Sequence, residues 1–253
     1  MINHVSNSML GLWGKCGIAF EYSYLRGLKI PPGVAAHRGG AAHKAFEINH
    51  KQKKITMEDL PEADLTDACR DSFVRRCEGG VLIPKEDRGR KDEILNTELN
   101  NAIKTVKIYH NVIAPQIIPV IVEKKITVHL GLDLPLIGVL DVMDDKKTII
   151  DFKSVDRKKP AGWEKTETQP SFYTLLVKNY YGIEPAFKYH IIKDIDDERD
   201  STRTEEDCNK LLDYIKIFIA SVNTGIFKPA EPGHWLCSEK WCGYWPLCRY
   251  AQK

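Results

Sequence analysis

The sequence has no long hydrophobic run and no strong excess of charge of either sign. No stretch of its 253 residues reaches the roughly 18 consecutive apolar residues that a membrane-spanning helix requires. The N-terminus also lacks the charged-then-apolar pattern of a secretory signal, so we expect a cytoplasmic protein with no membrane partner. The 37 Lys and Arg residues nearly balance the 35 Asp and Glu residues, which excludes the strongly basic composition of many polyanion-binding proteins. Any surface that binds a polyanion must therefore be local.

Internal repeats and low-complexity segments are also absent, and the seven cysteines do not indicate a disulfide framework. Their number is odd and the chain is long, whereas disulfide frameworks are typical of short secreted domains. Cys69, Cys77 and Cys208 lie among apolar positions of expected helices, so we expect them to be core residues. The hydrophobic fraction of 43% and the charged fraction of 28% are typical of a globular protein. The length suits one domain.

Hydrophobic periodicity changes along the chain. Helical spacing is expected first over residues 6–26, 35–51, 62–77 and 91–112. Short segments rich in Ile and Val then predict strands over 117–128, 138–143 and 148–152, followed by a helix over 170–180, a strand over 186–192 and a helix over 205–222. This order predicts an α/β fold with a mixed β-sheet core flanked by helices. We expect a single domain with a mainly helical part (1–114), a sheet-containing core (115–225) and an irregular Cys-rich tail (226–253).

Two aspartates occupy the expected strands on either side of a turn near Asp145. Asp141 and Asp151 would then lie on adjacent antiparallel strands, where opposed side chains approach within about 5 Å. Lys153 shares the face of Asp151 because residues two apart on a strand point the same way, and Phe152 points to the other layer. Both aspartates end apolar runs, where a carboxylate is costly to bury unless it is paired or bound to a metal.

This set of groups suits hydrolysis assisted by a divalent cation. Two carboxylates hold Mg²⁺ or Mn²⁺ through oxygen, and the cation activates water and neutralises charge on a phosphate. The amine of Lys153 would orient that water or stabilise the transition state. The alternative, that an Asp and a Lys on a strand are merely exposed, is common for this short pattern taken alone.

Four short motifs follow one another in an order that resembles the RecB-like branch of the PD-(D/E)XK nuclease superfamily, which includes Cas4 proteins and many phage exonucleases. The motifs cover residues 39 to 173 and are Gly39-x-x-x-His43, Gly138-x-x-Asp141, Asp151-Phe152-Lys153 and Gln169-x-x-x-Tyr173. The resemblance implies a restriction-endonuclease-like core and a nuclease activity on DNA.

The resemblance also implies roles for these residues. His43, Asp141, Asp151 and the backbone carbonyl of Phe152 would bind the metal ion, and Lys153 would be the catalytic lysine. Gln169 and Tyr173 lie four apart on one helical face and would position DNA or the lysine. Two further acidic residues, Glu47 and Glu123, are weaker candidates and are left out of the ligand set.

Three cysteines, Cys237, Cys242 and Cys248, are spaced C-x₄-C-x₅-C in the irregular tail, where a bound metal would supply folding free energy. Cas4 proteins and related phage proteins close a [4Fe-4S] cluster with one cysteine before the nuclease core and three after it, which implies Cys16 as the fourth ligand. Those proteins usually have two residues between the first pair of tail cysteines, and here there are four. A structural Zn²⁺ site therefore stays open as the alternative, with His234 nearby.

We therefore expect a Mg²⁺- or Mn²⁺-dependent deoxyribonuclease, most simply an exonuclease of the phage type acting in recombination, repair or phage DNA processing. Its partner would be DNA that is single-stranded or has free ends, with a recombination or replication protein as a possible second partner. The competing interpretation is a non-catalytic DNA-binding or adaptor protein that keeps the same fold and a structural cysteine site. Retention of Asp141, Asp151 and Lys153 disfavours that alternative.

Overall fold

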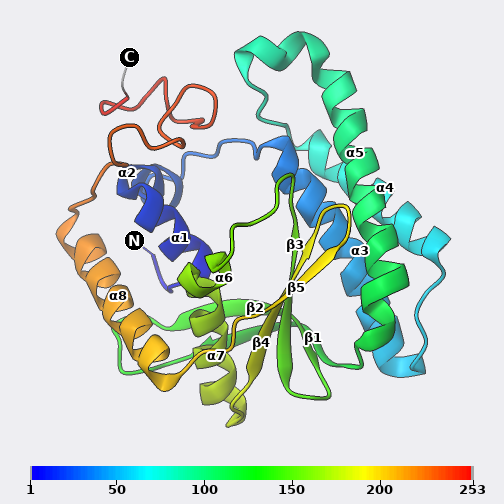
Figure 1. Ribbon diagram of the computed structural model, residues 1–253. Helices are drawn as coiled ribbons and strands as arrows, with labels where there is room; N and C mark the ends of the chain where they lie inside the picture. The colour runs from blue at the N-terminus through cyan, green and yellow to red at the C-terminus, as the bar shows by residue number, and fades with distance from the viewer. Residues whose placement is uncertain (1, 252–253) are drawn as a thin grey trace.

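A computed structural model describes residues 2–251 and contains helices around one sheet (Figure 1). The α-helices are α1 (Asn7–Lys15), α2 (Gly17–Phe20), α3 (Val34–Thr56), α4 (Glu62–Glu78), α5 (Lys91–Ile108), α6 (Trp163–Thr166), α7 (Thr168–Tyr181) and α8 (Glu205–Thr224). Shorter turns of other helix types are η1 (Glu21–Leu25), η2 (Lys85–Arg90), η3 (Tyr109–Ile113) and η4 (Ala114–Gln116). No helix in the described part of the chain is long and apolar enough to cross a membrane.

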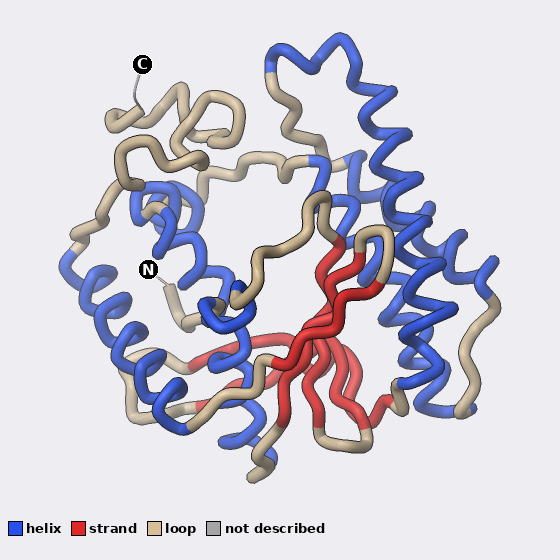
Figure 2. Tube along the Cα trace, in the orientation of Figure 1, coloured by secondary structure: helices blue, strands red, loops and turns tan. Residues whose placement is uncertain are grey.

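Five strands form one mixed sheet in the order in which they occur along the chain (Figure 2). They are β1 (Pro119–Val128), β2 (Leu136–Asp144), β3 (Thr148–Ser154), β4 (Ala186–Ile192) and β5 (Asp196–Asp200). Only β3 and β4 are parallel, since the chain returns between them through α6 and α7, and the other neighbours are antiparallel. The predicted α/β fold with a mixed sheet, flanking helices and a helical N-terminal region is confirmed.

The sheet separates two hydrophobic cores. Helices α3, α4 and α5 cover one face, where Phe46, Tyr109 and Phe152 pack together. Helices α1, α7 and α8 cover the other face, where Phe20, Phe172 and Phe218 are buried (Figure 1). Side chains alternate between the two cores along β3, as a strand covered on both faces requires.

The helix expected over residues 6–26 is wrong as a single element. Cys16 has an extended backbone (φ −161°, ψ 103°), so α1 ends there and α2 begins. Gly17 N donates to Lys228 O at 2.8 Å, and a Cβ at Gly17 would lie 2.8 Å from the same oxygen. The break is therefore set by the chain segment that enters the C-terminal tail, which local periodicity does not report.

The edge strand β5 consists of the charged residues Asp196–Asp200, for which the sequence predicted no strand. Lys188 pairs with Glu198 at 2.6 Å and His190 pairs with Asp196 at 2.8 Å across the β4–β5 ladder. Partners on β4 thus hold a segment whose own composition disfavours a strand. The tail from residue 226 to 251 contains turns and bends but neither helix nor strand, as expected.

Polar residues are buried on α3 beneath the sheet. Asn49 donates to Tyr109 Oη at 2.9 Å, and that hydroxyl also lies 2.9 Å from His50 Nε2. Lys53 pairs with Asp59 at 2.8 Å and donates to a backbone carbonyl. Burial lowers the pKa of His50 to about 3. The negative charge of Asp59 opposes this shift, and the positive charge of Lys53 adds to it. His50 is therefore neutral in the folded protein at ordinary pH.

This shift predicts acid destabilisation. The unfolded chain takes up a proton at His50 near pH 6.5 while the folded chain does not until about pH 3. The free energy of unfolding should therefore fall as pH drops through this window, with His50 contributing up to about 1.4 kcal/mol per pH unit. In His50→Gln, whose amide oxygen still accepts from Tyr109, this part of the slope should vanish. Urea unfolding across the window measures it, and identical slopes in the two proteins would contradict the assignment.

Candidate active site

The two aspartates of the second and third motifs lie on one face of the sheet. In the β2–β3 ladder Val142 pairs with Ile150, and extending that register by one residue sets Asp141 opposite Asp151. Asp151 is 5% exposed, whereas the Asp141 side chain keeps 26% of its surface. One carboxylate is thus buried and the other is reachable from solvent.

Lys153, Asp151 and Gln169 form a closed group of side chains. Lys153 Nζ lies 2.8 Å from Asp151 Oδ2 and donates to Gln169 Oε1 at 2.8 Å. Gln169 Nε2 in turn donates to Asp151 Oδ1 at 2.5 Å. An amide carries both an acceptor and a donor, so Gln169 can hold the ammonium and the carboxylate at once. The first turn of α7 brings Gln169 into contact with Asp151 and Lys153 of β3.

His43 reaches the same place from the opposite layer. Its Nδ1 lies 3.2 Å from Asp141 Oδ2, and its Nε2 lies 2.8 Å from the carbonyl oxygen of Phe152. The Phe152 ring is buried between α3 and the sheet, which fixes the direction of its carbonyl. The structure therefore brings together all four predicted metal-binding groups.

The electrostatics of these groups indicate a shortage of positive charge. Burial and the neighbouring Asp141 raise the pKa of Asp151, against the opposing effect of Lys153. Burial alone would lower the pKa of His43, but its hydrogen bond to Asp141 and the charges of both aspartates raise it to about 9. Burial, Asp141 and Glu47 together raise the pKa of Glu123 to about 7. A divalent cation would relieve the repulsion among the carboxylates.

The donor set fits such a cation. Two carboxylates, a carbonyl and an imidazole are ligands that Mn²⁺ accepts, and the oxygens also suit Mg²⁺. The buried Asp151 Oδ2 accepts no hydrogen bond, although the Lys153 ammonium is nearby as an ion pair. Among residues 2–251 no three acidic, His or Cys side chains are arranged to hold a metal ion as they stand. Here His43 contacts Asp141 and Lys153 contacts Asp151, so these donors are directed toward one another.

Tyr173 takes a different position from Gln169. Its hydroxyl donates to Val139 O at 2.7 Å, two residues from Asp141, and does not contact Lys153. The ring also lies against Gly138, where a Cβ would approach Tyr173 to 3.1 Å. Tyr173 thus ties α7 to the strand that carries Asp141.

Sequence reasoning missed Tyr189, which lies on β4 directly beside Asp151 in the parallel register. Lys153 Nζ lies 5.6 Å from the centre of its ring, and the buried hydroxyl has no hydrogen-bond partner among residues 2–251. No signal in the sequence pointed to it, because the β3–β4 register depends on the crossover. Of the two weaker candidates, Glu47 pairs with Lys44 and Lys51, and Glu123 has a left-handed backbone (φ +45°) inside β1. Such strain is frequent at functional sites.

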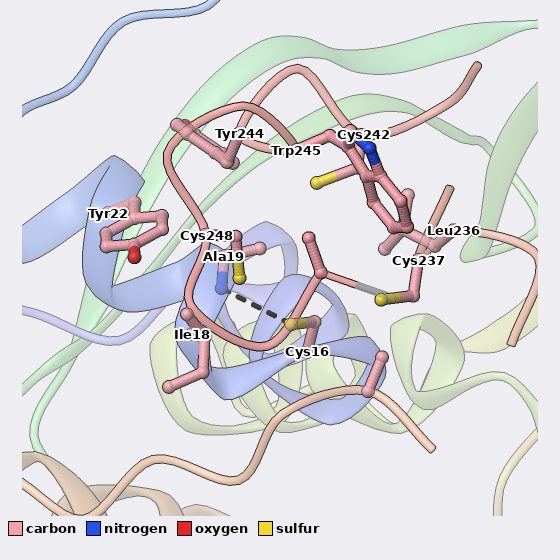
Figure 3. A pocket seen from close by; sticks show the side chains of 12 residues that line it. Cys16, Ile18, Ala19, Tyr22, Leu236, Cys237, Cys242, Tyr244, Trp245 and Cys248 are labelled. Atoms are coloured by element: carbon pink, nitrogen blue, oxygen red, sulfur yellow. Dashed lines mark hydrogen bonds between the residues drawn. The ribbon is translucent and has the colours of Figure 1, made fainter. Parts of the chain in front are cut away.

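The four predicted cysteines line a second site. Cys16 comes from the junction of α1 and α2, and Cys237, Cys242 and Cys248 come from the tail (Figure 3). Their sulfur atoms surround a common space, with Ile18, Leu236 and Trp245 among the apolar residues around it.

Electrostatics support the closeness of the four thiols. Burial raises the pKa of Cys242, and the charges of the other three cysteines raise it further. His234, the alternative ligand, does not line this recess, and its Nδ1 accepts from Leu236 N at 3.2 Å. The recess thus gathers four thiols, the type of donor that iron–sulfur clusters and structural zinc both use. As in the rest of residues 2–251, these side chains are not arranged to hold a metal ion as they stand.

Comparison with known proteins adds one finding on the fold. No family model and no curated protein matches the chain. Among solved structures, the chain is similar to a crystal structure of an Eubacterium rectale protein named "Putative exonuclease", with a TM-score of 0.58 and 14% sequence identity. The match covers 91% of this chain and 85% of that chain. The two proteins therefore share a fold over most of their lengths.

The two motif glycines predict opposite effects on stability. A Cβ at Gly138 would lie 2.6 Å from Leu176 Cδ1 and 3.1 Å from Tyr173, so Gly138→Ala should cost about 1–3 kcal/mol through overpacking. A Cβ at Gly39 would meet nothing within 4 Å, so Gly39→Ala should stabilise α3 by about 0.5–1 kcal/mol. Chemical unfolding of both variants measures this difference. Equal destabilisation would contradict it.

Proposed function

We propose that the protein is a metal-dependent DNA nuclease of the PD-(D/E)XK type. The observation that carries this proposal is the buried Asp151 carboxylate, which shares one face with Asp141 and contacts both Lys153 and Gln169. Burying a carboxylate beside another is costly without compensating positive charge. This arrangement would place a cation and the lysine ammonium next to a phosphodiester.

In this proposal each side chain has a separate task. Asp141, Asp151, His43 and the Phe152 carbonyl would hold Mg²⁺ or Mn²⁺, which when bound supplies positive charge at the phosphate and acidifies the attacking water. Lys153 donates hydrogen bonds from a position that Gln169 maintains. Its ammonium then stabilises negative charge that develops on the phosphate in the transition state. Tyr173 keeps α7 in register with β2.

The finer assignments are an exonuclease activity and membership of the RecB-like, Cas4-like branch. The order of the four motifs supports the branch, and the fold shared with the Eubacterium rectale protein agrees with an exonuclease. We propose that residues 1–253 act as one nuclease unit on DNA that is single-stranded or has free ends. Action with a recombination or replication protein belongs to the same proposal.

We further propose that Cys16, Cys237, Cys242 and Cys248 bind a [4Fe-4S] cluster, with Zn²⁺ as the alternative. Four thiols around one recess, sheltered by apolar side chains, support a soft metal site. Such a site would join the start of the chain to its tail across more than 200 positions. Its role would be structural because the recess and the aspartates have no residue in common.

Substitutions at the site test the nuclease proposal. Asp151→Asn and Lys153→Met keep the size of each side chain but remove its charge, so we expect Mg²⁺- or Mn²⁺-dependent cleavage to fall by at least about 10²- to 10³-fold. Release of label from end-labelled and circular DNA measures the rate and the need for an end. Circular dichroism checks that the fold is retained.

The matched controls are Asp145→Asn and Lys146→Met, which remove the same charges at the exposed turn between β2 and β3. Both should cleave like the unaltered protein. Unchanged cleavage by the site variants would exclude these residues as the catalytic groups. Tight DNA binding by the unaltered protein without cleavage under any divalent metal would favour the adaptor function instead.

Metal analysis tests the cysteine site. Protein purified without oxygen should contain iron and inorganic sulfide and absorb visible light, and Cys242→Ser should lose this absorbance and unfold at a lower temperature. Cys77→Ser is the control because Cys77 lies half-buried on α4, away from the recess. A colourless, zinc-loaded protein would reject the cluster and keep the thiol site. Absence of both metals would reject the site.

A further inference from the structure

The connection between β3 and α6, residues 155–162, carries the run Arg157-Lys158-Lys159 and is called here the basic loop. It begins two residues after Lys153 and ends seven residues before Gln169. Two residues of the proposed catalytic group therefore lie on either side of it in the sequence. In Figure 1 it runs from the end of β3 to α6. Its charges therefore belong to the immediate surroundings of the candidate active site.

Two arginines hold the basic loop at its ends. Arg38 of α3, whose side chain is 4% exposed, pairs with Asp156 and also contacts the Ser154 carbonyl. At the other end Arg199 of β5 donates to Lys159 O at 2.8 Å and to Pro160 O at 2.7 Å. The loop is therefore fixed by helix α3 at one end and by the edge strand β5 at the other.

The C-terminal end of the loop is also connected to the catalytic group through aromatic rings. Lys159 Nζ lies 4.7 Å from the centre of the Trp163 ring, and Trp163 packs on Tyr189 with ring centres 5.1 Å apart. Tyr189 is the ring that lies beneath Lys153. A chain of contacts thus connects the loop to the proposed catalytic lysine.

Between these anchors Arg157 and Lys158 are exposed. Within residues 2–251 neither side chain forms a salt bridge or a hydrogen bond, in contrast to Arg38, Lys153 and Arg199 around them. The hydrogen bond from Arg199 lowers the pKa of Asp197 on β5, and the charge of Lys158 helps to lower it further. Exposed charges held at this range interact only weakly through water, so both side chains can still meet an anion. The groups at the site itself, Asp141, Asp151 and Glu123, would instead repel a polyanion.

Distance limits what these charges can reach. Four residues of extended chain span at most about 14 Å, so Arg157 lies within that distance of Lys153. Nucleotides of one strand follow one another at about 3.4 Å along a duplex axis, so the span corresponds to about four nucleotides. A phosphate next to the reacting one, or a few positions away, therefore falls within reach of Arg157 and Lys158.

We propose that Arg157 and Lys158 bind backbone phosphates of the DNA strand whose neighbouring phosphodiester lies at Asp151 and Lys153. The inference rests on the proposed nuclease function and adds to it two residues that bind phosphates outside the reacting position, so that a strand several nucleotides long is bound more tightly than a short phosphodiester. Short phosphodiesters occupy the metal and lysine groups without touching the basic loop. The contact is to phosphate and carries no base sequence preference.

The test compares two double variants that lose the same charge. Arg157→Ala with Lys158→Ala removes the loop charges, and Lys54→Ala with Lys146→Ala removes two exposed lysines that form no ion pair in the described part of the chain. Lys54 lies 11 residues beyond His43 on α3, about 16 Å along the helix axis. Lys146 lies in the turn before β3, at the end of that strand away from Lys153. The control charges are thus at the opposite end of the sheet.

Binding of a labelled single-stranded oligodeoxynucleotide is measured in EDTA, so that no cleavage occurs. The loop variant should bind about tenfold more weakly at low salt, and its plot of log affinity against log salt should be shallower by about 1.4, or 0.7 per phosphate. The control variant should retain the unaltered affinity and slope. Equal losses in the two variants, or none in either, would overturn the proposal.

Cleavage separates this inference from the proposed function. With Mn²⁺ the loop variant should show a raised KM and a nearly unchanged kcat on the oligonucleotide, and an unchanged rate on thymidine 5′-p-nitrophenyl phosphate, which is too short to reach the loop. A loss of kcat on both substrates would assign the loop a catalytic role and contradict phosphate binding. If the unaltered protein cleaves nothing but the EDTA binding results hold, the nuclease proposal fails and the phosphate contact stands.

Discussion

Two carboxylates on neighbouring strands repel each other, and the structure around the end of β3 compensates for that repulsion. Asp151 is buried beside Asp141, and its charge is met by Lys153 and by the amide of Gln169. Asp141 is met by His43 from the opposite layer. Burial and mutual repulsion still raise the pKa of Asp151, so these partners offset the cost only in part. A divalent cation is the remaining charge that the site requires in our proposal.

The sheet and its two helical layers make this convergence possible. α3 approaches β3 from one face and α7 approaches it from the other, so His43 and Gln169 meet at one strand although they belong to different cores. Phe152 contributes twice, because its ring anchors one core while its carbonyl faces His43. Packing on both faces thus limits how far the polar groups can move.

The surroundings of the site continue the same electrostatic pattern. An acidic centre attracts cations, whereas the DNA strand of our proposal requires positive charge close by. In that proposal the basic loop supplies the charge, from a segment that Arg38 and Arg199 hold at its ends. The cysteine recess joins the α1–α2 junction to the tail, where Gly17 and Lys228 are also hydrogen-bonded. The arginine contacts and the cysteine recess each hold a segment that has no regular secondary structure.

The sequence alone predicted the type of most elements and the residues that gather at the candidate site. Helical spacing predicted α3, α4, α7 and α8, and spacing of two along a strand placed Asp151 and Lys153 on one face. Tertiary structure decided what depends on distant partners. The break at Cys16 comes from contact with Lys228, the acidic strand β5 forms on β4, and Tyr189 reaches Lys153 through the parallel register. The local sequence pattern indicates which face of an element is buried. The residues that pack against that face come from segments far apart in the chain, so the local pattern does not identify them.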